Sequence, residues 1–266
     1  MAATPSRLPQ VNAYATFGER RLARVYVWEI PVRIAHWIIF FSIAVLCVTG
    51  WYIHSPFLIS RGPRAYTMGY MRFIHILTGY ILLAAVFVRA YWALAGNYWA
   101  NWKWLVPTTR AQWKALGQMI KYYTFFRREP VHQVGHNALA GFAYAGIFFV
   151  MVVEIFTGLV LYSQTRGPGI ARSLFGWVPG VIDIQYLRLF HFLGMFICIA
   201  FVIHHVYSAI LVSIEERNGL VESIFSGYKF VPEWELKEEE RHRLQILKRS
   251  LPSRIARKLA EREKRK

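Results

Sequence analysis

The stretch RIAHWIIFFSIAVLCVTG, residues 33–50, decides the fold class. Apart from Arg33 and His36 near its start, it is almost wholly apolar, and together with the residues that follow it is long enough to cross a bilayer as a helix. An ionisable side chain inside such a segment is energetically expensive and marks a functional site by default. The other histidines of the chain give His36 its explanation.

Four windows of the sequence have this apolar character, at residues 34–53, 73–94, 138–162 and 187–214. Each meets the requirement of roughly 20 mostly apolar residues for a membrane span. Because backbone groups in lipid must be satisfied within the segment, each window is predicted to be a helix. The sequence therefore predicts an all-α fold: an integral membrane four-helix bundle, residues 34–214, between an N-terminal segment 1–33 and a charged tail 215–266.

Basic residues are strongly segregated along the chain. The net charge of +17 is of the size found in nucleic-acid-binding proteins, but 25 of the 32 Lys and Arg lie in segments 1–33, 94–135 and 215–266. The connections 54–70 and 163–186 together hold only 4. The positive-inside rule then predicts that both termini are cytoplasmic. Anionic lipid explains the basic excess, including the basic cytoplasmic tail, and nucleic acid is not an expected partner.

Four of the nine histidines fall at matching depths of the predicted bundle. His191 and His205 are 14 residues apart, which puts both on one face of a helix and about 21 Å apart along its axis. His204 points to nearly the opposite side. If the spans alternate in direction, His75 lies at the depth of His191, and His36 lies near that of His205.

Two histidine pairs at two depths are the arrangement needed for two stacked haems, because imidazole suits iron and two axial histidines fill both open positions. A haem bound in this way transfers electrons and binds no substrate. The alternative is that these histidines are hydrogen-bonded packing residues. Arg33 is a candidate contact for a haem propionate or, alternatively, an interface arginine. Glu154, inside the third span, is a partner for another polar group, a contact with another chain, or part of a proton path.

Four segments resemble a known family. They are RVYVWEIPVRIAHWIIFFSIAVLCVTGWYI (24–53), IHILTGYILLAAVFVRAYWALAGN (74–97), GHNALAGFAY (135–144) and EIFTGLVLY (154–162). With the histidines of the fourth span, they resemble the b-type cytochrome subunit of membrane-bound nickel–iron hydrogenases over about residues 24–215. The tail beyond Arg217 is longer and more charged than the resemblance leads us to expect.

The resemblance implies a subunit of a hydrogen:quinone oxidoreductase complex in the prokaryotic cytoplasmic membrane. Such a subunit holds haem b, takes electrons from the iron–sulfur chain of the hydrogenase small subunit, and passes them to quinone. The nickel–iron centre lies in the large subunit, so no catalytic residue is expected in this chain. Similarity to the formate dehydrogenase cytochrome implies that the axial ligands of two haem irons are His36, His75, His191 and His205, with one haem as the alternative.

The same resemblance places a quinone site near the start of the third span, where His136 and Asn137 are candidates because quinone carbonyls need hydrogen-bond donors. Their alternative roles are a helix N-cap and an interface residue. Two other functions stay open from the sequence. One is a cytochrome subunit of a formate dehydrogenase or thiosulfate reductase type complex. The other is a haem-free membrane anchor or transporter, which would be colourless.

Overall fold

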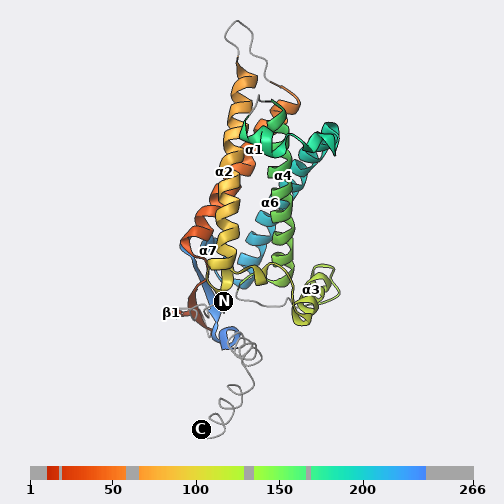
Figure 1. Cartoon of the computed structure of the whole chain (residues 1–266). Coiled ribbons are helices and arrows are strands. Elements are labelled where there is room, and N and C mark those ends of the chain that lie inside the picture. Colours follow the sequence, from red (N-terminus) through yellow and green to blue (C-terminus); the bar gives the residue numbers. More distant parts are fainter. Residues whose placement is uncertain (1–10, 18–19, 58–65, 129–134, 166–168, 238–266) are drawn as a thin grey trace, which may run out of the picture.

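The computed structural model describes residues 11–17, 20–57, 66–128, 135–165 and 169–237. Four long helices dominate it and run side by side (Figure 1): α1 (Ile30–His54), α2 (Thr67–Ala95), α4 (Ala138–Thr165) and α6 (Ile184–Glu216). Each is long and apolar enough to cross a membrane. The predicted all-α four-helix bundle is therefore confirmed, and each helix extends to or past the limits of its predicted window.

A three-stranded antiparallel sheet that the sequence did not predict closes one end of the bundle. It consists of β1 (Val11–Phe17), β2 (Arg20–Tyr26) and β3 (Tyr228–Pro232), in the order β1-β2-β3. The sheet joins the segment before α1 to the segment after α6, so both lie at the same end of the molecule (Figure 1). We call this end the sheet end. That both flanking segments share one end agrees with the prediction for the termini, but the side of the membrane stays a prediction.

The sheet end has its own apolar core, in which Ala23, Val25 and Val231 from the strands pack with Trp28 and Trp99. Short elements surround it: η1 (Tyr98–Ala100), η2 (Trp102–Trp104), α3 (Arg110–Tyr123) and α7 (Leu220–Ser226). Helix α3 begins with a capping box between Thr109 and Gln112, which satisfies the backbone amides of these two residues. At the opposite end lie α5 (Ile170–Phe175) and η3 (Val178–Gly180).

Glu29 fastens the start of α1 to the end of α2. Its carboxylate accepts hydrogen bonds from the Trp92 indole N–H and the Asn97 backbone amide, both at 2.8 Å. The Asn97 side chain donates in return to the Val27 carbonyl oxygen at 3.0 Å. These contacts fix the depth of α1 relative to α2, which matters because each helix carries one of the predicted histidines.

The middle of the bundle is held by a small apolar cluster. Leu82 and Val86 of α2 and Met151 of α4 are buried there, and three residues of α1 pack against them: Ile39, Ile43 and Leu46. Along α1 this cluster lies between His36 and Thr49. It therefore separates the two depths at which the histidines were predicted to pair.

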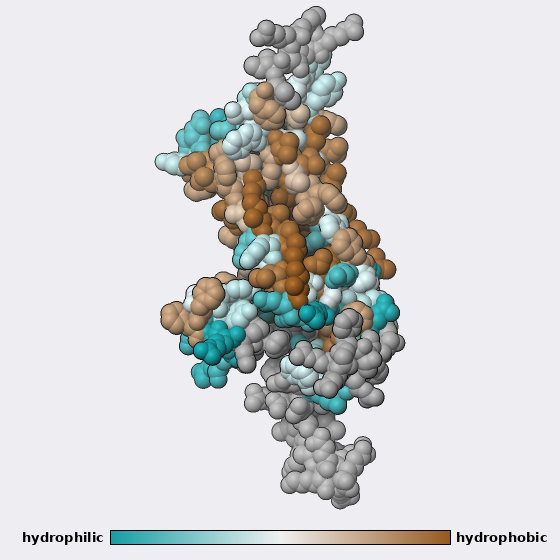
Figure 2. Space-filling model, turned by 180° about the vertical axis from the view of Figure 1, so that it is seen from behind, coloured by the Kyte–Doolittle hydropathy of each residue, from teal (hydrophilic) through white to brown (hydrophobic). Residues whose placement is uncertain are grey.

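The outward faces of the spans are strongly apolar. Phe41, Phe87, Phe149 and Ile203 are each at least 60% exposed. Figure 2 shows hydrophobic residues over the middle of the bundle, with hydrophilic ones more frequent towards its two ends. Apolar patches of this extent are rare on soluble monomers and mark a surface that faces lipid or protein. The charged tail beyond residue 237, with His242, lies outside the described residues, as does His132.

Candidate functional site

The structure brings the four predicted histidines together as two pairs. The ring centres of His75 on α2 and His191 on α6 are 6.2 Å apart, with the rings at 77° to each other. The ring centres of His36 on α1 and His205 on α6 are also 6.2 Å apart, with the rings at 57°. The pairing inferred from helix phase and depth is therefore the pairing in space. The first pair lies in the half of the bundle away from the sheet, and the second lies nearer to the sheet end.

Both separations fit a metal ion held between two imidazoles. An imidazole nitrogen binds a metal at about 2 Å and lies about 1.1 Å from its ring centre, so two in-line ligands put their ring centres about 6.3 Å apart. The pairs meet this expectation at 6.2 Å without direct ring stacking. Among the described residues, no group of three or more His, Cys, Asp and Glu forms a metal site. The ring separations are those expected of a bis-imidazole site.

Threonine hydroxyls set the tautomer of the His75–His191 pair. Thr49 Oγ1 lies 2.7 Å from the Val45 carbonyl oxygen and 2.9 Å from His75 Nδ1. A hydroxyl has one hydrogen, and the carbonyl can only accept, so Thr49 donates to Val45 and accepts from the Nδ1–H of His75. The lone pair of His75 is then on Nε2, the nitrogen available to a metal.

The same device recurs on α4 for His191. Thr157 Oγ1 lies 2.8 Å from the Val153 carbonyl oxygen and 2.9 Å from His191 Nδ1. By the same reasoning His191 is protonated on Nδ1 and has a free lone pair on Nε2. A glycine follows each threonine, and a Cβ at Gly50 or Gly158 would lie 3.2 Å from Cε1 of the adjacent histidine ring. Two Thr-Gly dipeptides thus hold the two rings and leave room for them.

The His36–His205 pair is held differently. The Tyr144 hydroxyl lies 3.2 Å from His205 Nδ1, and the ring of Phe201 stacks on His205 with 5° between the planes. His36 Nδ1 is buried and has no hydrogen-bond partner among the described residues. A buried side-chain nitrogen without a hydrogen-bond partner is uncommon in folded proteins.

Two arginines lie on the elements around this pair. Arg33, one turn before His36 on α1, donates through Nη1 to the Phe225 carbonyl oxygen, and its Nε is buried without a partner among the described residues. Arg89 on α2 is only 7% exposed. Its guanidinium lies 3.4 Å from the Ala100 carbonyl oxygen and 5.7 Å from the centre of the Phe148 ring, and it has no ion pair within the described part of the chain. Both cations retain capacity to bind an anion.

His136 and Asn137 occupy different environments just before α4. Asn137 Oδ1 accepts from the Ala140 amide at 2.8 Å, which is an N-cap interaction. The ring of His136 stacks on Trp28 with centres 4.7 Å apart and meets the Tyr144 ring edge-on at 4.6 Å. Burial, with the nearby cations Arg89 and Lys229, lowers the pKa of His136 to about 3, so its imidazole is neutral at physiological pH.

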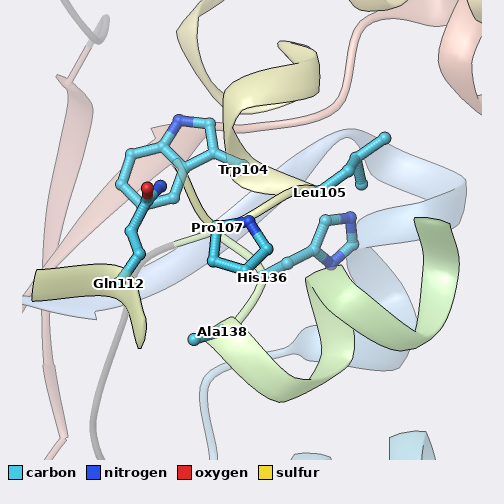
Figure 3. A pocket seen from close by; sticks show the side chains of 6 residues that line it. All are labelled: Trp104, Leu105, Pro107, Gln112, His136 and Ala138. Carbon is cyan, nitrogen blue, oxygen red and sulfur yellow. The ribbon is translucent and has the colours of Figure 1, made fainter. Parts of the chain in front are cut away.

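A small hollow opens beside His136 (Figure 3). Its lining comes from η2 and the turn after it, from α3, and from the start of α4 with the segment before it: Trp104, Leu105, Pro107, Gln112, His136 and Ala138. The free space is about 10 Å³, which is room for about one water molecule. A quinone ring is larger, so the quinone role of His136 and Asn137 stays a prediction that requires this region to open.

The sequence of the whole helical region identifies the family. Residues 27–227, which include all four long helices, match the family model described as Prokaryotic cytochrome b561. The chain belongs to the prokaryotic cytochrome b561 family. A b-type cytochrome carries haem b. Both histidine pairs of this cytochrome have the ring separation expected of two axial ligands, and in the His75–His191 pair the threonines also leave Nε2 free.

Curated relatives of this cytochrome share a common description. It is 39% identical to the Probable Ni/Fe-hydrogenase B-type cytochrome subunit of Cupriavidus necator over 81% of this chain and 91% of the relative. It is 37% identical to the protein of the same description from Rhodobacter capsulatus, over 79% of this chain and 83% of the relative. It is 34% identical to the Probable Ni/Fe-hydrogenase 1 B-type cytochrome subunit of Escherichia coli K12, over 77% of this chain and 90% of the relative. The family resemblance predicted from the sequence is confirmed.

Sequence reasoning missed three groups at the site. It did not single out Arg89, which the structure buries, although an arginine within an apolar run is itself a functional signal. It did not single out Thr157 or Tyr144. The Thr-Gly dipeptides at 49–50 and 157–158 were the available signal for the threonines, but the same dipeptide also stands at 78–79, so the signal was not specific.

Proposed function

We propose that this cytochrome is the membrane-embedded electron-transfer subunit of a nickel–iron hydrogenase, that it holds two b haems, and that it passes electrons to quinone. The observation that carries the proposal is the presence of two bis-imidazole sites, each with ring centres 6.2 Å apart, one above the other in a four-helix bundle. Haem b held in such sites supplies one-electron transfer across the apolar layer.

Different residues of the chain would hold the two haems. His75 and His191 would hold the outer haem, with Thr49 and Thr157 fixing their rings, and His36 and His205 would hold the inner one. Thr49 lies thirteen residues after His36 on α1, which separates the two sites by about 20 Å along the bundle. Arg33 and Arg89 would bind carboxylates of the inner haem, because a buried arginine stays charged and requires an anion.

The direction of transfer follows from the predicted orientation. With the sheet end cytoplasmic, as the distribution of Lys and Arg indicates, the His75–His191 site lies in the outer half of the membrane and receives electrons from the iron–sulfur small subunit. The His36–His205 site delivers them near the cytoplasmic surface, where His136 and Asn137 would contact quinone. The names of the relatives support a hydrogenase as the electron source.

The experiment is an optical measurement on membranes that contain this cytochrome and its hydrogenase. We expect hydrogen gas to reduce the b haem, and a short-chain quinone added afterwards to reoxidise it. In membranes with His75→Ala, hydrogen should no longer reduce the haem, while the hydrogenase still reduces an artificial dye. Reduction of the b haem by formate and not by hydrogen would contradict the proposal and favour the formate dehydrogenase alternative.

A further inference from the structure

Glu154 is the sole acidic residue within the four long helices apart from the two glutamates that end α6. Glu154 lies on α4, in the half of the bundle that holds the His75–His191 pair, and its side chain is only 15% exposed. A carboxylate at this depth is costly unless it has a strong polar partner. The structure supplies that partner, because Glu154 Oε2 lies 3.2 Å from His191 Nδ1.

The direction of this hydrogen bond follows from Thr157. Since the Thr157 hydroxyl donates to the Val153 carbonyl oxygen at 2.8 Å, His191 must carry its hydrogen on Nδ1. That hydrogen is shared between Thr157 Oγ1 at 2.9 Å and Glu154 Oε2 at 3.2 Å. The Nδ1 of His75, the other member of the pair, contacts the Thr49 hydroxyl, and within the described residues no carboxylate forms an ion pair with this ring. The carboxylate therefore acts on one ring of the pair.

Gly194 makes space for the carboxylate. It lies one turn after His191 on α6, and a Cβ built there would be 1.9 Å from Glu154 Oε1. From the sequence, Glu154 could be a partner for another polar group, a contact with another chain, or part of a proton path. The contact with His191, and the space that Gly194 leaves for the carboxylate, favour the first of these roles, a partner for another polar group of the same chain.

We infer that Glu154 is a positioning residue for His191 and that it lowers the reduction potential of the outer haem. A carboxylate that accepts from a ligating imidazole makes the metal-bound nitrogen more basic. A more basic ligand stabilises ferric over ferrous iron. The couple concerned is the addition of one electron to ferric iron to give ferrous iron, with no bond made or broken at Glu154. The inference rests on the proposed haem site.

The test is a redox titration of the purified chain in the His205→Ala background, in which only the outer haem is expected. Glu154→Gln removes the charge, and Gly194→Ala keeps the charge but displaces the flexible carboxylate from its seat. We expect each to make the outer haem on the order of tenfold easier to reduce, which is 59 mV for a one-electron couple. The matched control is Glu215→Gln, the same chemical change at an exposed position at the far end of α6.

The outcomes separate the two proposals. An upward shift of the outer haem potential in both variants, with none in the Glu215→Gln control, supports the inference. Unchanged potentials in folded, haem-loaded Glu154→Gln and Gly194→Ala proteins would overturn it and leave the proposed function intact. If the His205→Ala chain binds no haem at all, the assignment of the outer pair fails and the proposed function fails with it.

Discussion

Replacing His205 with alanine removes one haem from the chain, whereas replacing its neighbour His204 leaves the haem content unchanged. The two residues are adjacent on α6, equally polar and at nearly the same depth in the bundle. The two variants therefore differ chiefly in the side of α6 from which an imidazole ring is removed. His205 faces His36 with ring centres 6.2 Å apart. His204 is exposed on the outer face of the helix, with Ser208 Oγ 3.4 Å from its Nε2.

The physical reason for the difference is ligand number. With His205→Ala, His36 alone cannot fill both axial positions of the inner haem, while the His75–His191 pair keeps both of its ligands. The measurement is haem per chain in the purified variants, with circular dichroism to show that the helices are retained. Equal losses of haem from the His204→Ala and His205→Ala proteins would contradict the assignment of the inner pair.

Replacing Gly141 with alanine strongly destabilises the fold, whereas the same change at Gly146 does not. A Cβ at Gly141 would lie 2.1 Å from the Trp104 carbonyl oxygen, which is backbone and cannot rotate away. Overpacking of this kind costs about 1–3 kcal/mol or more. At Gly146, five residues further along α4, nothing lies within 4 Å of such a Cβ. There alanine removes the conformational freedom of glycine and adds about 0.5–1 kcal/mol of stability.

Thermal unfolding of the two variants in detergent measures this difference. We expect a lower midpoint for Gly141→Ala and an unchanged or higher one for Gly146→Ala. The contact also bears on the site, because Gly141 packs α4 against the η2 turn beside His136. A Gly141→Ala protein as stable as the unchanged chain would show that α4 and η2 are not in close contact.

The bundle and its histidine pairs could be predicted because both depend on local rules. An apolar run of the right length in lipid must be helical, and 100° per residue fixes that His191 and His205 share a face. Alternating directions of the spans then match His75 with His191 by depth. None of these steps requires knowing how one helix is rotated about its own axis relative to its neighbours.

The features that escaped prediction depend on such rotations or on distant pairing. Thr157 and Glu154 meet His191 only because α4 presents that face to α6, which the sequence alone does not specify. The sheet pairs β2 with β3, about two hundred residues apart in the chain, and the arginines of the 20–26 segment interrupt its apolar alternation. Arg89 was overlooked because it lies close to the end of its span, where arginines ordinarily reach the interface.

Counting haem shows whether one chain holds two bis-histidine haem sites. The measurement is a pyridine haemochrome assay with reduced-minus-oxidised spectra on the detergent-purified chain, scaled to protein. We expect two b haems per chain. Only one haem in fully loaded, folded protein would contradict the two-site account, and a colourless folded protein would favour the haem-free anchor or transporter.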